Sequence, residues 1–173
     1  MITSAALVLI VAAVTLLLWK QFMPAARKPD WLPKELQDGK EYSRERLFSA
    51  KVNGFEVAAK PDRVYRLADG RLCVIEFKVR SNTRLVHQGD IWQISAGAAA
   101  LSRTGTVADH GWVIVEDRNT RQRQAHQVSV LKGQALTEVM QRHVDVETGA
   151  VTPSRTSSRR KCTNCGHRAA CQP

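Results

Sequence analysis

A β-hairpin in the middle of the chain carries the residues whose types and spacing could do chemistry. Two alternating runs rich in β-branched residues, Asp62–Leu67 and Leu72–Val79, are separated by the polar sequence Ala68-Asp69-Gly70, which is typical of a tight turn. If those three residues form the loop, Asp62 lies directly across from Glu76, with the two Cβ atoms about 5 Å apart. A two-residue loop would shift the register by one and take Asp62 off the face of Glu76.

The second strand places a lysine beside the two acids. Lys78 follows Glu76 by two residues, so both side chains share one face of the strand, whereas Cys73, Ile75 and Phe77 point to the opposite, apolar face. Two adjacent carboxylates repel each other unless a proton or a cation intervenes. A divalent metal ion relieves that repulsion, activates a bound water and neutralises charge on a phosphate, which Lys78 is suited to hold. The alternative is an exposed polar strand face with an ordinary ion pair.

The elements around the hairpin predict an α/β domain with a small mixed β-sheet flanked by helices. A helix over Leu85–Leu101 carries an apolar stripe, and we expect Trp92 and Trp112 in the core. The segment Glu41–Ser49 fits either a first strand or an extension of the preceding helix. The other expected elements are a short helix over Lys34–Gln37, strands over Phe55–Ala59, Trp112–Val115 and Gln127–Val130, and a helix over Ala135–Val144.

The hairpin and the helix after it resemble a known family. Pro61-Asp62, followed by Glu76-Phe77-Lys78 after the turn, resembles the signature of the PD-(D/E)XK nuclease superfamily, and the run AAKPDRVYRLADGRLCVIEFKVR resembles its RecB-like branch. Gln93, in QISAGAAAL, matches the glutamine of that branch's Q-x-x-x-Y motif, whereas Gly97 stands at the tyrosine position. The resemblance covers Glu45–Cys171.

The resemblance implies a restriction-endonuclease-like core and a nuclease that uses Mg²⁺ or Mn²⁺ to hydrolyse the phosphodiester bonds of DNA. It implies that Asp62, Glu76 and the backbone carbonyl of Phe77 are the metal ligands. It further implies that Lys78 is the catalytic lysine and that Gln93 positions this lysine or the DNA.

Departures from the family's pattern support a second interpretation. That branch usually has a histidine upstream of the aspartate, and no histidine precedes His87 here, so the position is vacant or filled by an acid such as Glu45. Together with Gly97, this favours a catalytically weak or inactive module that binds nucleic acid or a protein partner at the membrane. The intact acids and lysine favour the enzyme, acting as an exonuclease on single strands or DNA ends.

Three of the four cysteines, Cys162, Cys165 and Cys171, lie within ten residues near the end of the chain. This spacing is too tight for a disulfide framework and suits a metal. The sequence KCTNCGHRAAC resembles the C-terminal C-x₂-C-x₅-C of the CRISPR-associated "Cas-four" exonucleases and of AddB-type nucleases, which implies an iron–sulfur cluster. Such a cluster normally needs four thiolates, and we expect Cys73 in the core. A zinc site completed by His167 is therefore the alternative, and idle cysteines in a degenerate tail are a third interpretation.

The start of the chain is predicted to be a membrane anchor. The first 19 residues carry no charged side chain, and as a helix residues 2–19 are roughly 27 Å long, close to the ~30 Å of a bilayer core. Basic residues begin at Lys20 and none precedes the stretch. This bias predicts a single-pass protein of the inner (cytoplasmic) membrane, with the C-terminal domain in the cytoplasm. A cleaved signal peptide ending near Ala25 and Ala26 is the alternative, although it lacks a basic start.

These observations divide the chain of 173 residues into a transmembrane anchor (1–23), a tether (24–40), a nuclease core (41–151) and a basic linker with a cysteine-rich tail (152–173). The net charge of +10 lies entirely after residue 19. It favours phosphate polyanions such as DNA, or an anionic membrane surface, although a basic face also serves solubility alone.

Overall fold

The computed structural model describes residues 28–152, together with Thr15 and Thr163. Its elements follow in chain order as α2 (Lys34–Asp38), β1 (Lys40–Arg44), β2 (Phe48–Val52), β3 (Phe55–Ala59), β4 (Arg63–Arg66), β5 (Leu72–Arg80), α3 (Gln88–Leu101), β6 (His110–Asp117), β7 (Arg123–Ser129) and α4 (Gly133–Glu147). The predicted mixed α/β architecture is confirmed.

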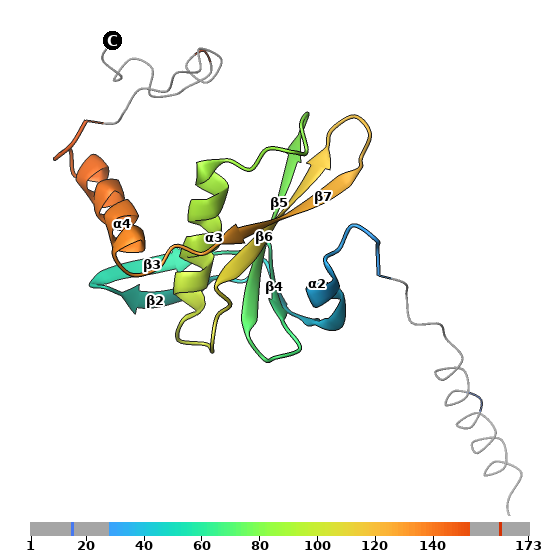
Figure 1. Ribbon diagram of the computed structural model, residues 1–173. Helices are drawn as coiled ribbons and strands as arrows, with labels where there is room; N and C mark the ends of the chain where they lie inside the picture. The colour runs from blue at the N-terminus through green and yellow to red at the C-terminus, as the bar shows by residue number, and fades with distance from the viewer. Residues whose placement is uncertain (1–14, 16–27, 153–162, 164–173) are drawn as a thin grey trace, which may run out of the picture.

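Five strands form one mixed sheet in the order β1-β4-β5-β6-β7, and β2 pairs with β3 in a separate two-stranded sheet. The central strands β5 and β6 run parallel, whereas the other neighbours in the larger sheet are antiparallel. A parallel pair needs a crossover connection, and α3 provides it. In Figure 1, α3 lies over one face of this sheet, with the β2–β3 hairpin beside it, and α2 lies on the other face.

Alternation along β5 divides the hydrophobic core between the two faces. Leu72 and Val74 pack toward α3 with Ile94, whereas Cys73 and Ile75 pack toward α2 with its buried residues. The odd and even residues of β5 therefore face different helices, as the period of a strand requires.

The β4–β5 hairpin has the predicted register. Val64 pairs with Val74, and the N–H of Leu67 donates to the carbonyl of Arg71 at 2.8 Å. Gly70 has a φ of 86°, which the last position of a three-residue loop favours. The three-residue turn on which the placement of the acids depends is confirmed.

Some expected boundaries differ from the structure. The crossover helix begins at Gln88 rather than at Leu85, because a capping box between His87 and Asp90 fixes its start. Both β6 and β7 are longer than expected. The expectation of a core position for Trp92 is wrong, since this side chain is 46% exposed.

Helix α2 belongs to the folded domain although the sequence analysis assigned it to the tether. Leu36 is fully buried and Leu32 nearly so, and both pack against the sheet. Among the residues that the structure describes, no helix has the length and apolar character needed to cross a membrane. The expected anchor lies, apart from Thr15, outside the described residues.

Candidate active site

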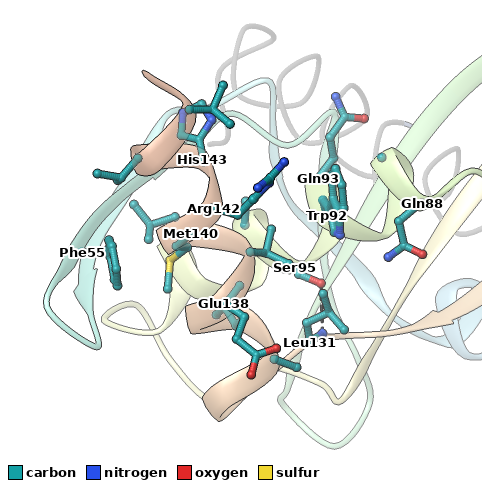
Figure 2. Close-up of a pocket in the computed structure, with 18 of the residues that line it drawn as sticks. Phe55, Gln88, Trp92, Gln93, Ser95, Leu131, Glu138, Met140, Arg142 and His143 are labelled. Carbon is teal, nitrogen blue, oxygen red and sulfur yellow. Dashed lines mark hydrogen bonds between the residues drawn. The ribbon is translucent and has the colours of Figure 1, made fainter. Parts of the chain in front are cut away.

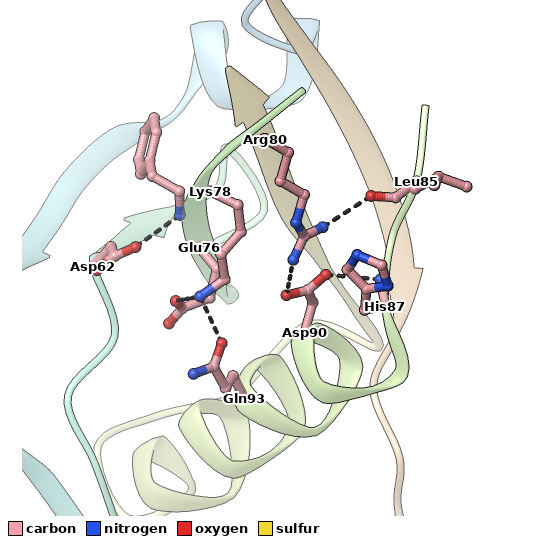
Figure 3. Close-up of polar contacts among 9 residues, drawn as sticks. Asp62, Glu76, Lys78, Arg80, Leu85, His87, Asp90 and Gln93 are labelled. Carbon is pink, nitrogen blue, oxygen red and sulfur yellow. Dashed lines mark hydrogen bonds and ion pairs between the residues drawn. The ribbon is translucent and has the colours of Figure 1, made fainter. Parts of the chain in front are cut away.

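The two predicted acids meet where β4 begins beside β5. Glu76 lies on the α3 face of β5, and Asp62 immediately precedes β4. The Oδ2 atom of Asp62 accepts the backbone N–H of Phe77 at 2.7 Å (Figure 3). Because both polar groups of one strand residue face the same neighbouring strand, the carbonyl of Phe77 also faces the side on which Asp62 lies. Two carboxylates and a backbone carbonyl thus gather at one point.

Lys78 is held between the acids and the crossover helix. Its Nζ donates to Glu76 Oε2 at 3.2 Å and to Gln93 Oε1 at 2.6 Å. The Lys78 side chain is 22% exposed and that of Glu76 10%, so the ammonium group stands at the rim of the site with its acid beneath it. The structure therefore brings together the four side chains that the sequence analysis selected as catalytic.

The electrostatics of Glu76 indicate a place for a cation. Burial raises the pKa of Glu76 above its ordinary value, and the nearby carboxylate of Asp62 raises it further, while Lys78 acts in the opposite direction. Two repelling carboxylates in a partly dry site are the arrangement that a hard divalent ion stabilises. The donor set of Asp62, Glu76 and the carbonyl of Phe77 fits Mg²⁺ or Mn²⁺.

A second ion pair, which the sequence analysis did not identify, docks α3 onto the end of β5. Arg80 Nη2 donates to Asp90 Oδ1 at 2.6 Å, and Asp90 Oδ2 accepts the backbone N–H of His87 at 2.8 Å (Figure 3). A signal was present in the sequence. Arg80 follows Lys78 by two residues on one strand face, and Asp90 precedes Gln93 by three on one helix face.

Glu45, the acid considered for the missing histidine, lies beside the site by its backbone. Its N–H donates to the carbonyl of Asp62 at 3.1 Å. Its side chain is 70% exposed and lies 3.9 Å from Lys60. The carboxylate is thus turned to solvent and paired outside the cluster of Asp62, Glu76 and Lys78.

Gly97, at the tyrosine position of the helix motif, is a close-packing position. A Cβ atom there would lie 3.1 Å from a methyl group of Val74 and 3.2 Å from the ring of Pro61. Glycine in place of the family's tyrosine thus lets α3 pack closely against the sheet beside Pro61, the residue that precedes Asp62.

A groove of about 1030 Å³ adjoins the site between α3, α4 and β3 (Figure 2). Gln93 lines it, so the groove reaches the helix face that contacts Lys78. Trp92 also lines it, and Arg142 and His143 of α4 stand on the opposite side. The predicted cluster residues Cys162, Cys165, His167 and Cys171 lie outside the described residues.

The sheet is mixed and one helix crosses it, with Glu76 and Lys78 on the strand before the crossover and Asp62 immediately before the neighbouring strand, which is the arrangement of a metal-dependent phosphodiesterase site. The family model of the PD-(D/E)XK nuclease superfamily matches residues 9–172, and the chain belongs to this superfamily. Its members are generally metal-dependent nucleases that hydrolyse phosphodiester bonds.

A solved structure supports the same fold. The crystal structure of SSO0001 matches with a TM-score of 0.53 and 17% identity, over 75% of this chain and 59% of that chain. At this identity the likeness shows the fold alone. No curated protein matches the chain.

Proposed function

We propose that this protein is a deoxyribonuclease of the RecB-like branch, similar to the "Cas-four" exonucleases, that uses Mg²⁺ or Mn²⁺ to degrade DNA from an end. One observation carries the proposal. Asp62, Glu76 and Lys78 share one face of the β4–β5 hairpin, and Gln93 from the crossover helix holds the lysine.

The side chains divide the work between binding a cation and handling the phosphate. Asp62 and Glu76 would hold the ion with the carbonyl of Phe77. When bound, such an ion supplies an activated water and charge neutralisation on the phosphate. Lys78, whose rotamer is fixed by Glu76 and Gln93, places its ammonium group where it can hold a phosphate oxygen or the attacking water.

Two features support a nucleic-acid strand as the substrate. The net charge is +10, which favours a polyanion. Trp92, 46% exposed beside the groove that Gln93 lines, offers an aromatic surface on which a base of a single strand can stack.

The activity is tested with the full-length chain on end-labelled linear single-stranded DNA, circular single-stranded DNA and RNA, with Mg²⁺, Mn²⁺ or EDTA. We expect metal-dependent loss of the linear DNA only. Lys78→Ala should lower the rate by about 100-fold or more, whereas Lys51→Ala, which removes an exposed lysine from β2, should not. Equal rates for wild type and Lys78→Ala would refute the assignment, and loss of the circular DNA would exclude an exonuclease.

The absence of an upstream histidine favours a second function, a module that binds nucleic acid or a protein partner at the membrane without cleaving. The same proteins decide between the two. The binding module is supported if wild type and Lys78→Ala bind the labelled DNA equally well and neither protein degrades it with Mg²⁺ or with Mn²⁺.

We also propose that residues 2–19 anchor the protein in the cytoplasmic membrane, with the nuclease domain in the cytoplasm. The apolar character and the charge bias of this stretch support the proposal. Leu9→Arg together with Val11→Arg should release the chain into the soluble fraction, because each central arginine costs about 2.5–3.5 kcal/mol on insertion. Unchanged sedimentation with membranes after alkaline extraction would contradict it.

For the C-terminal cysteines we propose an iron–sulfur cluster, on the resemblance of their spacing to that of the "Cas-four" nucleases. Anaerobically purified protein should show broad visible absorption that disappears in Cys165→Ser. A colourless protein that releases stoichiometric zinc on denaturation would instead support the site completed by His167.

A further inference from the structure

Three metal-ligating side chains meet on the face of β5 opposite to the nuclease site. Glu35 comes from α2, Cys73 from β5 and His110 from β6. One ligand atom of each lies within 4.8 Å of those of the other two. These residues do not belong to the Asp62 and Glu76 cluster, because odd-numbered residues of β5 face α2 and even-numbered ones face α3.

The sheet itself brings the cysteine and the histidine together. Ile75 of β5 pairs in parallel with Trp112 of β6, so two residues earlier Cys73 lies beside His110 on the same face. The Sγ of Cys73 lies 3.7 Å from the backbone carbonyl of His110. Glu35, on α2, is the third member of the group, and its Oε1 atom lies 2.8 Å from His110 Nε2.

We propose that Glu35, Cys73 and His110 form a metal site for Zn²⁺ that fastens α2 to the sheet, with water in the fourth position. Sulfur, imidazole nitrogen and carboxylate oxygen are the ligands that zinc takes in proteins, whereas a thiolate and an imidazole do not suit Mg²⁺. The proposal does not depend on the nuclease activity.

Binding the ion requires the three ligand atoms to rearrange from their present hydrogen-bonded positions. Zinc–ligand bonds of about 2.0–2.3 Å in a tetrahedron separate neighbouring ligand atoms by about 3.3–3.6 Å. Ligand atoms at the present limit of 4.8 Å would have to approach by about 1.2–1.5 Å, whereas Glu35 Oε1 and His110 Nε2, now 2.8 Å apart, would have to separate by about 0.5 Å. Cys73 is fully buried, while the side chains of Glu35 and His110 are 32% and 19% exposed, so an ion has an entry from the solvent side.

The surroundings of the three ligands support an ion rather than a random polar contact. The indole N–H of Trp112 also donates to Oε1 of Glu35, an outer contact of the kind that orients carboxylate ligands. A cation bound between Cys73 and Glu35 would take the place of the thiol proton and give the buried sulfur a charge partner.

Helix α2 needs such an anchor. It has five residues, no side-chain cap at its start and too few turns to be stable by itself. The competing interpretation is a hydrogen-bonded group of Glu35, His110 and Trp112 that anchors α2 alone, beside an inert buried cysteine.

Cobalt absorption separates the two interpretations. The full-length chain with Cys162→Ser, Cys165→Ser and Cys171→Ser keeps Cys73 as its only cysteine, so the C-terminal cysteines cannot contribute. One equivalent of Co²⁺ should give thiolate-to-cobalt charge-transfer absorption in the near ultraviolet, and Zn²⁺ should bleach it because zinc binds such sites more tightly. Co²⁺ held by Asp62 and Glu76 has no sulfur ligand and gives no such band.

Matched variants on this background complete the test. Cys73→Ala should abolish the band, and Glu35→Gln should weaken cobalt binding at least 10-fold. His143→Ala, which removes an exposed histidine from α4, should change nothing. Saturating Zn²⁺ should raise the Tm of the background chain by about 5–10 °C and leave that of Cys73→Ala unchanged. Circular dichroism without metal checks that each variant folds. The absence of the band, or its persistence in a folded Cys73→Ala chain, would overturn the site.

Discussion

The ion pair between Arg80 and Asp90 offers a quantitative test of how the site is held together. The pair joins the end of β5 to the first turn of α3, two residues after Lys78 and three before Gln93. The two side chains are 18% and 5% exposed. If this contact fixes α3 on the strand, removing it loosens the domain and the grip of Gln93 on Lys78.

The expected loss follows from the hydrogen bonds that each substitution removes. The carboxylate of Asp90 accepts one bond from Arg80 and one from the backbone of His87. In Asp90→Asn the side chain keeps one acceptor oxygen, and its NH₂ group takes the place of the other. That NH₂ group cannot accept a hydrogen bond, so one charge-assisted bond is lost at a cost of about 2 kcal/mol. Asp90→Ala loses both bonds and leaves Arg80 without its carboxylate, which should cost about 3 kcal/mol, the low end for a broken buried pair because the arginine is partly exposed.

A double-mutant cycle in urea measures the interaction itself. The free energies of unfolding of Arg80→Met, Asp90→Ala and the double variant should give a coupling of at least about 1.5 kcal/mol. The exposed pair of Arg44 and Glu41, with side chains 58% and 32% exposed, is the matched control and should couple by less than about 0.5 kcal/mol. Similar values for the two pairs would refute the idea that the Arg80–Asp90 contact holds α3 in place.

The pH dependence of this coupling has a definite sign. Burial by itself raises the pKa of Asp90, but the hydrogen bonds from Arg80 and from the backbone of His87 hold that pKa below its ordinary value. A carboxylate with a lowered folded-state pKa contributes stability above its unfolded value of about 3.9 and loses it as the pH falls through the folded one. The coupling should thus be constant from pH 8 to pH 5 and decline only in stronger acid. A decline between pH 7 and pH 5 would contradict the assignment.

Three further substitutions or modifications test the packing around the site. Gly111→Ala should lower the free energy of unfolding by about 1–3 kcal/mol, because its Cβ would lie 2.5 Å from a methyl group of Ile94; an unchanged urea midpoint would contradict this close approach. Gly97→Tyr should lower nuclease activity by displacing α3 and Gln93, although it restores the family's motif, and a more active variant would show that the helix has room. In the metal-free native chain, Cys73 should resist iodoacetamide at pH 8 and react in urea, as mass spectrometry can measure, because a thiol with a pKa of about 12 has little thiolate; rapid labelling of the native chain would refute its burial.

The acids of the site could be predicted from the sequence because the information is local. A single turn sets the register that joins Asp62 to Glu76, and the residues of that turn, ending in Gly70 at a positive φ, specify its length. Alternation along one strand then places Lys78 on the same face. None of these steps needs knowledge of the rest of the fold.

The strand over Phe55–Ala59 is confirmed as β3, but its partner β2 and the hairpin that the two form were missed, although the sequence carries signals for both. Phe48 and Ala50 are buried between exposed neighbours, a pattern of period two that the sequence already shows. The dipeptide Asn53-Gly54 follows, and both residues have positive φ values of 50° and 89°, as the tight turn favoured by such dipeptides requires. The hairpin lies against α3 and so supports the helix that carries Gln93.

The exposure of Trp92 could not be predicted from its helix. A tryptophan next to an apolar stripe is usually buried, but the ring of Trp92 lines the groove between α3 and α4 instead. Of the residues of α4, Leu136 alone is buried. This helix therefore borders a groove instead of packing closely against the rest of the domain (Figure 2).

The parallel pairing of β5 with β6 could not be predicted from the local sequence, because it depends on how α3 returns the chain to the sheet. That pairing places Cys73 next to His110, 37 residues later in the chain, while the same strand carries Glu76 on its other face. A change in the seating of α3 that shifted β6 by one residue would turn His110 away from Cys73. It would also move Gly111, whose missing side chain admits Ile94 of α3. The contact of Gln93 with Lys78 and the proposed zinc site therefore both depend on how α3 is seated, although no side chain belongs to both sites.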